Sequence, residues 1–214
     1  MTTIETTQTL SPEWLQRFGG IARLYGDSGL EALASAKFLV IGIGGVGTWI
    51  AEALARTGAG AITLVDLDDI CITNTNRQIH ALAHTVGHSK TAVMAERLRA
   101  INPELEVREV EDFVALDNLA EIILPNYDVV IDAADNFRVK AALISHCRAQ
   151  KQQIVTVGSA GGKRDPRQIV SGDLSRTLQD PLLSRVRKQL RQKHDFPRNQ
   201  KRVFSVEAIY SPEQ

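Results

Sequence analysis

A glycine-rich turn between a strand and a helix constrains the fold of this chain more than any other feature. The turn spans residues 42–47 in the pattern G-x-G-G-x-G and follows the apolar, β-rich run 37–41. Residues 46–56, which come next, have apolar side chains at helical spacing. Small residues let the backbone approach a phosphate, and the following helix offers free N–H groups to it. The sequence therefore predicts a nucleotide-binding unit.

Strand-like and helix-like segments alternate along most of the chain. Strands are predicted at residues 37–41, 61–65, 106–110, 128–131 and 154–157, the first two of them buried, and helices at residues 46–56, 90–101 and 140–150. This alternation predicts a Rossmann-like α/β fold, with a mostly parallel sheet covered by helices on both faces. In the first helix, we expect the buried face to carry Val46, Ile50, Ala53 and Leu54.

The pattern becomes mixed after residue 162. Strands are expected at residues 168–170 and 203–209, and Asp180-Pro181 opens a predicted helix at residues 180–193. We therefore divide the chain into a helical lead-in (1–36), a nucleotide-binding domain (37–162) and a C-terminal extension of that domain (163–214). The chain stops just after a strand-like run, so we expect a further covering element beyond Gln214.

Composition excludes several classes of protein. With 214 residues, 43% of them apolar and 23% charged, the chain is long enough for one domain and does not have the composition of a disordered protein. Its apolar runs are too short to cross a bilayer, and its polar start lacks a secretory signal pattern. Cys71 and Cys147 form no C-x-x-C pair, which argues against a cysteine zinc site. We expect a cytoplasmic protein in which both thiols are buried.

The polar residues near the predicted turn indicate which nucleotide is bound. Asp66 ends the second strand, where a carboxylate can accept ribose hydroxyls. A long polar loop follows it, and a second acidic pair, Asp132 and Asp135, follows the fourth strand at the carboxyl edge of the sheet. Cations and carboxylates around a phosphate site suit ATP with Mg²⁺ better than a hydride carrier. An NAD-dependent oxidoreductase is therefore the less favoured interpretation.

These motifs resemble those of the ThiF/MoeB/ubiquitin-activating superfamily, whose members adenylate a carboxylate with ATP. The resemblance covers about residues 37–140. Three further stretches, residues 17–26, 73–82 and 179–182, are similar to the bacterial tRNA threonylcarbamoyladenosine dehydratases within that superfamily. Those enzymes use ATP to convert the open threonylcarbamoyl group on tRNA into its cyclic form. The resemblance thus implies a reaction that passes through an acyl-adenylate and releases AMP and pyrophosphate.

The resemblance also implies roles for individual residues. Asp66 would bind the ribose of ATP, and Asp135 would carry Mg²⁺. Four residues would act in catalysis, namely Arg56, Arg77, Lys90 and Asp135. The remaining nucleotide contacts would come from Gly42, Gly44, Gly45, Gly47, Asp66, Asp68, Asn74, Gln78 and Asn136. The implied partners are tRNA, a second copy of the chain and a cysteine desulfurase or sulfur-acceptor system, and a monovalent cation is conceivable in the glycine and asparagine loops.

The C-terminal part of the chain is basic. Residues 185–214 contain eight lysines and arginines against three acids, although the whole chain has a formal net charge of zero. Such a segment either forms a solvated helix face or binds a polyanion. A tRNA substrate favours the second interpretation. The candidate tRNA-binding residues are Lys163, Arg164, Arg185, Arg187, Lys188, Arg191 and Lys193.

Three other functions remain open. The first is adenylation of the C-terminus of a ubiquitin-like sulfur-carrier protein, against which the missing zinc cysteines count. The second is the dehydrogenase, against which Arg56, Arg77 and Lys90 count. The third is a binding module that retains the nucleotide without catalysis. It predicts ATP binding without AMP formation.

Overall fold

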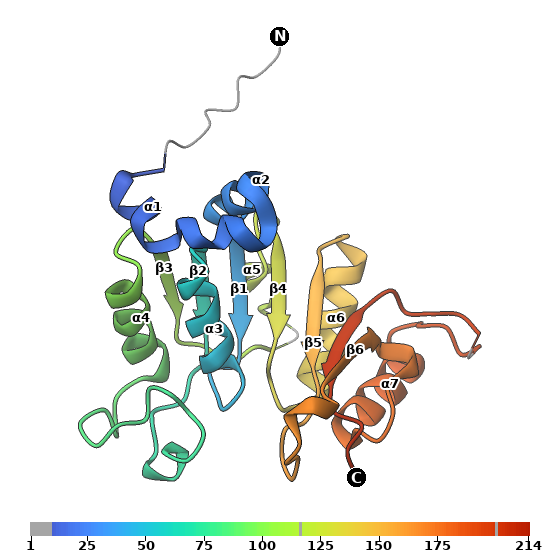
Figure 1. The fold of residues 1–214 in the computed structure, drawn as a ribbon. Coiled ribbons are helices and arrows are strands. Elements are labelled where there is room, and N and C mark those ends of the chain that lie inside the picture. The colour runs from blue at the N-terminus through green and yellow to red at the C-terminus, as the bar shows by residue number, and fades with distance from the viewer. Residues whose placement is uncertain (1–9, 116, 200) are drawn as a thin grey trace.

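The fold is a single mixed sheet flanked by helices, as the computed structural model of residues 10–115, 117–199 and 201–214 describes it (Figure 1). In this part of the chain seven strands lie in the order β3-β2-β1-β4-β5-β7-β6. All neighbouring strands are parallel except β6 and β7, which confirms the predicted mostly parallel sheet. The strands are β1 (Lys37–Ile41), β2 (Ala61–Val65), β3 (Glu106–Val110), β4 (Val129–Asp132), β5 (Ile154–Val157), β6 (Val170–Asp173) and β7 (Glu207–Tyr210).

Helices cover both faces of the sheet. α3 and α4 pack on one face, and α5, α6 and α7 pack on the other. α1 and α2 lie across the amino ends of the central strands, at the top of Figure 1. No described helix is long and apolar enough to pass through a bilayer. The helices are α1 (Pro12–Phe18), α2 (Ala22–Ser35), α3 (Gly47–Arg56), α4 (Lys90–Ile101), α5 (Leu119–Ile122), α6 (Phe137–Ala149) and α7 (Pro181–Lys193), with short 3-10 turns at Gly19–Ile21, Ile72–Asn74, Pro166–Gln168 and Leu174–Arg176.

The central strands are apolar throughout because both of their faces are buried. In β1, Phe38 and Val40 point into the cluster formed with α3 and α4. Leu39 and Ile41 point into the opposite cluster, formed with α6 and α7. Alternation along a strand thus supplies both cores, which explains why the sequence shows a continuous apolar run here.

The prediction for the buried face of α3 is partly wrong, since Ile50 and Leu54 pack against the core but are not its most buried residues. The structure buries Ala51 and Ala55 completely, whereas Ala53 is exposed and Ile50 is only half-buried. Small side chains let the helix lie close to the sheet. Position 47 has to be glycine, because a Cβ there would overlap the carbonyl oxygen of Gly42.

The C-terminal segment joins the same sheet. The strand expected at residues 168–170 begins only at Val170, because Pro166 opens a 3-10 turn that Asp165 caps. β7 then inserts between β5 and β6, parallel to β5. The predicted helix is confirmed as α7, and Asp180 caps it as expected by accepting the N–H of Leu183 at 2.8 Å.

Candidate active site

A cavity of about 780 Å³ opens at the carboxyl ends of the central strands, at the lower edge of the sheet in Figure 1. It lies over the boundary between β1 and β4, from which the chain connections run outward in opposite directions. Ligands bind at such switch points in open α/β sheets. The walls come from the glycine turn, the loops after β2, β3, β4 and β5, and the first turns of α4, α6 and α7.

The glycine turn forms the first wall. Gly42 has a φ of +89°, and a Cβ there would lie 2.9 Å from the carbonyl oxygen of Ala133. Gly44 and Gly45 line the cavity directly, and the side chain of Arg77 lies across Gly45. Three of the four predicted glycines therefore lie at the cavity. The fourth, Gly47, lies beneath the turn, where it permits the close packing of α3.

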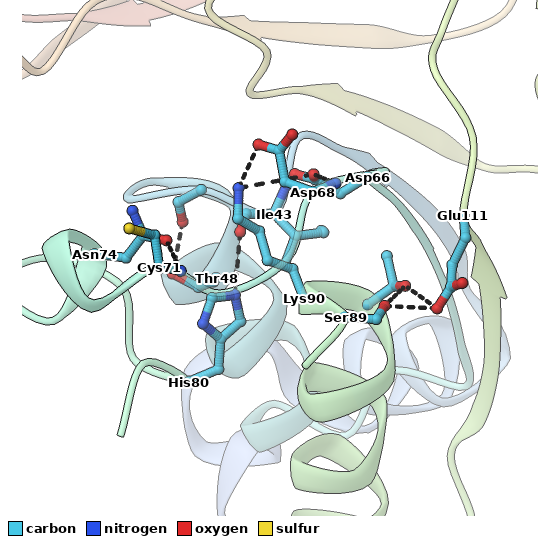
Figure 2. A network of polar contacts seen from close by, with 12 residues as sticks. Ile43, Thr48, Asp66, Asp68, Cys71, Asn74, His80, Ser89, Lys90 and Glu111 are labelled. Carbon is cyan, nitrogen blue, oxygen red and sulfur yellow. Dashed lines mark hydrogen bonds and ion pairs between the residues drawn. The ribbon is translucent and has the colours of Figure 1, made fainter. Parts of the chain in front are cut away.

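Asp66, at the end of β2, holds this turn in place. Its Oδ2 accepts the N–H of Ile43 at 2.7 Å, and its Oδ1 accepts the N–H of Asp68 at 2.9 Å. The carboxylate still lines the cavity. Figure 2 shows it beside the ammonium group of Lys90. Asp66 thus joins β2 to the glycine turn at the point where a sugar hydroxyl could reach it.

Lys90 is a buried cation between two carboxylates. Its Nζ lies 2.6 Å from Oδ2 of Asp68 and 3.8 Å from Oδ1 of Asp66 (Figure 2). It is the first residue of α4, whose N-terminus Ser89 caps, and Ser89 in turn donates to Glu111 at 2.6 Å. This anchoring keeps a positive charge at the cavity wall, where a phosphate could take the place of a carboxylate partner.

The loop after β2 brings three further polar side chains to the cavity. Asn74 is buried, and its Oδ1 accepts the N–H of Cys71 at 2.9 Å. Arg77 donates only to the carbonyl of Thr73 and to Oδ1 of Asn76, so no carboxylate in the described part of the chain neutralises it. Gln78 is 6% exposed, and its Oε1 lacks a hydrogen-bond partner among the described residues. Arg77 and Gln78 are therefore available to a ligand.

A buried histidine, which the sequence analysis did not assign to the site, contacts the backbone of the glycine turn. His80 is 1% exposed, and its Nε2 lies 3.2 Å from the carbonyl oxygen of Ile43. Burial lowers the pKa of His80, which keeps the imidazole neutral near pH 7. A neutral ring with its proton on Nε2 donates to Ile43 and so braces the glycine turn.

The loop after β4 forms the opposite wall and carries Asp135. The Asp135 carboxylate is exposed in the cavity, and the neighbouring Asn136 uses its Oδ1 to cap α6 through the N–H of Arg138 at 2.9 Å. Asp132 instead points into the core. Its Oδ1 lies 3.0 Å from Nζ of the fully buried Lys140, and its Oδ2 accepts the hydroxyl of Thr156 at 2.7 Å.

This buried pair fixes the wall that carries Asp135. Lys140 also donates to the carbonyl oxygen of Asp132 at 2.9 Å, so one side chain joins the end of β4 to the first turns of α6. Burial lowers the pKa of Lys140, although the adjacent Asp132 opposes that change. Sequence analysis missed Lys140, which had only the spacing of eight residues from Asp132 as a signal.

The last wall is the glycine-rich segment after β5. Ser159 donates its N–H to Oδ2 of the buried Asp180 at 2.8 Å, and Gly158 has no room for a Cβ beside that carboxylate. Asp180 therefore fixes this segment to the N-terminus of α7. Leu182, in the first turn of α7, completes the wall.

Arg56 is the one predicted catalytic residue that the structure does not bring to the cavity. It ends α3, roughly 13 Å along the helix from the glycine turn. Its Nε lies 2.7 Å from Oε1 of Glu52, which also binds Arg97 of α4. Burial raises the pKa of Glu52, but the hydrogen bonds from Arg97 and Arg56 outweigh it and hold that pKa below its ordinary value. Glu52 therefore joins α3 to α4, and Arg56 pairs with Glu52 within α3.

The two cysteines differ from the expectation that both are buried. Cys147 is completely buried, and burial raises its pKa to about 12. Cys71 is exposed, which makes the prediction for it wrong, because its short 3-10 turn lies at the surface of the long loop. The hydroxyl of Thr73 donates to Sγ of Cys71 and lowers the pKa of that thiol.

The candidate tRNA-binding residues fall into three groups. Lys163 and the backbone of Arg164 are held by the C-terminal Glu213. Arg185 lies over the ring of Phe137, and Lys193 is exposed near the end of α7. The remaining three lie together in a second hollow of about 520 Å³, lined by Ser184, Arg187, Lys188, Arg191, Gln192 and Arg198.

Two arginines of this hollow are also part of the fold. Arg187 donates to the hydroxyl of Thr177, and burial together with the charge of Arg191 lowers its pKa. Arg191 donates to the carbonyl of Pro197 and lies 5.0 Å from the ring centroid of Phe204. Arg191 is therefore half-buried and only partly accessible to a ligand. Lys188 and Arg198 are the exposed cations of the hollow.

Fold and cavity together define a Rossmann-like nucleotide-binding protein. The glycine turn, Asp66 and the cations Arg77 and Lys90 are arranged around one opening. The wall that carries Asp135 adds a further carboxylate, which a hydride-transfer site does not need. A profile of the ThiF family matches residues 19–202 of the chain.

Comparison with known proteins narrows this class. The tRNA threonylcarbamoyladenosine dehydratase of Escherichia coli K12 is 54% identical over 204 residues, which cover 95% of this chain and 76% of the relative. The enzyme of that name from Haemophilus influenzae is 52% identical over 196 residues, covering 92% and 75%. A crystal structure of the E. coli dehydratase in complex with ATP matches with a TM-score of 0.93, over 95% of this chain and 84% of that one. The chain therefore belongs to the ThiF family, within its tRNA threonylcarbamoyladenosine dehydratases.

Proposed function

We propose that this protein uses ATP to cyclise threonylcarbamoyladenosine in tRNA. The threonyl carboxylate attacks the α-phosphorus of ATP, which forms an acyl-adenylate and releases pyrophosphate. A nucleophile of the same modified base then attacks the activated carbonyl carbon, closes the ring and expels AMP. The observation that carries the proposal is the cavity with its glycine turn, Lys90 and Arg77, in a chain 54% identical to a dehydratase whose structure contains ATP.

The cavity residues suit this chemistry. Asp66 is placed for the ribose hydroxyls, while Asn74, Arg77 and Lys90 surround the space for the phosphates. Attack of a carboxylate on a phosphate brings negative charges together, so fixed cations lower the barrier. The positions of Asp68, Gln78 and Asn136 on the lining support their assignment as further nucleotide contacts. We leave Arg56 out of the proposed site.

Asp135 is the proposed metal ligand. No cluster of three or more His, Cys, Asp or Glu side chains in the described ranges could hold a metal by itself. A single carboxylate such as that of Asp135 fits Mg²⁺, which takes one or two carboxylates and completes its shell with phosphate oxygens and water. When bound, Mg²⁺ would neutralise charge on the departing pyrophosphate. The exposed carboxylate of Asp135 would hold it opposite the glycine turn.

The unpartnered Oε1 of Gln78 supports a monovalent cation as a further ligand of the glycine and asparagine loops. A carbonyl-type oxygen without a hydrogen-bond donor is a suitable cation ligand. Either a cation or the nucleotide would satisfy this buried atom.

The hollow on α7 supports contact with the tRNA backbone. Lys188 and Arg198 are exposed there beside Arg187 and Arg191, and the lining contains no acidic residue. Arg185, Lys193, Lys163 and Arg164 would extend this surface. Concentrated cations of this kind bind phosphates and release counterions.

Three broader assignments also belong to this proposal. Exposed apolar side chains on α2 and α3, Leu24, Tyr25 and Trp49, support a homodimer. The exposed thiol of Cys71 is compatible with a cysteine desulfurase or sulfur-acceptor partner. A tRNA substrate supports a cytoplasmic location.

AMP release tests the function directly. The protein is incubated with ATP and Mg²⁺, with tRNA that carries threonylcarbamoyladenosine and with unmodified tRNA as the control. We expect AMP only with the modified tRNA, accompanied by the loss of one water mass from the nucleoside. AMP formed instead with a carrier peptide that ends in Gly-Gly would favour the sulfur-carrier alternative, and ATP binding without AMP would favour the binding module.

A further inference from the structure

Two arginine side chains share one aromatic ring next to the mouth of the cavity. The guanidinium carbon of Arg138 lies 5.3 Å from the ring centroid of Phe137, and that of Arg185 lies 5.9 Å from it. Both distances are within the range of a cation–π contact. The Phe137 ring therefore contacts both guanidinium groups, which brings two positive charges to one place on the surface.

The three residues lie directly beside residues that line the cavity. Phe137 follows Asn136, which is part of the wall that carries Asp135. Arg185 is one helical turn beyond Leu182, on the same side of α7. α6 and α7 pack side by side at the C-terminal end of the sheet (Figure 1). The cluster thus lies where the first turns of α6 and α7 meet the cavity, next to the wall that carries Asp135.

The charges of the cluster are not compensated within the described part of the chain. Neither Arg138 nor Arg185 forms an ion pair there, whereas Arg56, Arg97, Arg99 and Arg167 all do. Arg138 is also in the first turn of α6, where the helix dipole disfavours a cation. Two like charges beside one ring, neither paired within the described residues, favour the arrival of an anion.

We propose that Phe137, Arg138 and Arg185 bind the RNA nucleotide that flanks the modified adenosine. The guanidinium N–H groups donate to its phosphate, and a guanidinium face stacks on its base. A flat, charged surface that offers both contacts fits RNA better than an acidic peptide, whose carboxylates need no stacking partner. This inference rests on the proposed function, because it requires that the modified adenosine that enters the cavity belongs to tRNA.

Direct binding of tRNA to four variants tests the inference. The variants are Arg138→Ala, Arg185→Ala, their combination, and Arg148→Ala as the matched control. Arg148 is an exposed arginine in the last turn of α6, beside a hollow at the other edge of the sheet. Affinity is measured at several salt concentrations without ATP. We expect the double variant to bind tRNA roughly tenfold more weakly and to lower the salt slope by about 1 for each phosphate that it no longer binds.

Steady-state kinetics provide a second readout. The double variant should raise KM for modified tRNA and leave KM for ATP unchanged. Phe137→Leu, which keeps an apolar side chain, should give a smaller rise, because the guanidinium groups lose only their orientation. An unchanged affinity and salt slope in the double variant would overturn the inference, as would an equal loss of affinity in Arg148→Ala or weaker binding of an acidic carrier peptide instead of tRNA.

These outcomes separate the inference from the function on which it rests. A native protein that binds tRNA but forms no AMP with the modified substrate contradicts the proposed reaction and leaves the binding comparison intact. A native protein that forms AMP, with variants that bind tRNA normally, contradicts only the arginine cluster.

Discussion

At the scale of single residues, the most demanding arrangement is the buried pair of Asp132 and Lys140. Neither side chain is exposed. Among the described residues, Lys140 donates to Asp132 alone, and Asp132 accepts from both Lys140 and Thr156. We expect Lys140→Met to lower the free energy of unfolding by about 3–5 kcal/mol, since it leaves a buried carboxylate without its charged partner. Urea denaturation measures this change.

The double variant Lys140→Met, Asp132→Leu is the control for that prediction. It leaves no uncompensated charge, so it should recover most of the stability that the single variant lacks. A double variant as unstable as the single one would show that packing, and not charge, sets the cost.

The two thiols differ in reactivity. We expect an alkylating reagent to modify Cys71 in the folded protein and Cys147 only after unfolding, because the thiolate is the reactive form and burial opposes it. The rate at Cys71 should rise with pH through a midpoint below 9.0, the ordinary value against which its pKa is lowered. Thr73→Ala should move this midpoint upward. Labelling followed by peptide mass analysis measures both.

Asp135 is predicted to act in catalysis without a role in stability. Its carboxylate is exposed in the cavity, so Asp135→Asn should reduce the rate of AMP formation at least about a hundredfold while the unfolding midpoint stays the same. Asp27→Asn, an exposed change on α2 at the other edge of the sheet, serves as the control. Normal turnover in Asp135→Asn would remove this residue from the proposed metal site.

At the scale of elements, sequence patterns predict strands better than helix faces. β1, β2, β3 and β5 have the predicted bounds because apolar or alternating runs with clear ends leave little choice. The face of α3 could not be predicted from apolar spacing, because closeness to the sheet selects Ala51 and Ala55 over larger side chains. The start of β6 was misplaced for a local reason, the turn that Pro166 begins.

Glu52 couples two of these elements, α3 and α4. We expect Glu52→Gln to lower the free energy of unfolding at neutral pH by about 1–3 kcal/mol, because the side chain that binds Arg56 and Arg97 is no longer charged. The folded pKa of Glu52 is below its ordinary value, so its contribution is present above about pH 4.3 and disappears as the pH falls through the folded pKa. The difference between native protein and variant should therefore shrink between about pH 5 and pH 3.

Glu96→Gln, an exposed change on α4, is the matched control for this measurement. It should leave the unfolding curve unchanged at each pH. A Glu52 variant with the same pH dependence as the native protein would show that the ion pairs with α4 contribute nothing.

At the scale of the whole molecule, the cavity assembles residues from position 41 to position 182. The position of Asp66 at the end of a strand predicted that residue, and the family resemblance predicted Arg77 and Lys90, all of which line the cavity. The contacts that hold the walls could not be predicted, because they join residues far apart in the sequence. They are those of His80 with Ile43, of Lys140 with Asp132, and of Asp180 with Ser159. Arg56 is not among the residues that line the cavity, because it lies at the far end of α3 and pairs there with Glu52.

Ligand-induced stabilisation tests the cavity as a unit. ATP at a hundredfold excess over its Kd should stabilise the native protein by about 2.7 kcal/mol, a rise in Tm of about 5–10 °C for a chain of this size. Arg77→Ala and Lys90→Met should each reduce that shift. Arg56→Ala should keep it, because Arg56 lies outside the cavity. A thermal scan with and without ATP decides between these outcomes.

The position of β7 has a consequence for synthesis of the chain. β6 is made before β7, yet it lies beyond β7 in the sheet, so β5 has an unpaired edge until residues 207–210 leave the ribosome. The Gly158 wall depends on the same event, since Gly158 donates its N–H to Ile209. Open strand edges on a growing chain favour association with other chains. The Gly158 wall of the cavity thus forms only after β7 has been made, although Gly158 itself is synthesised about fifty residues earlier.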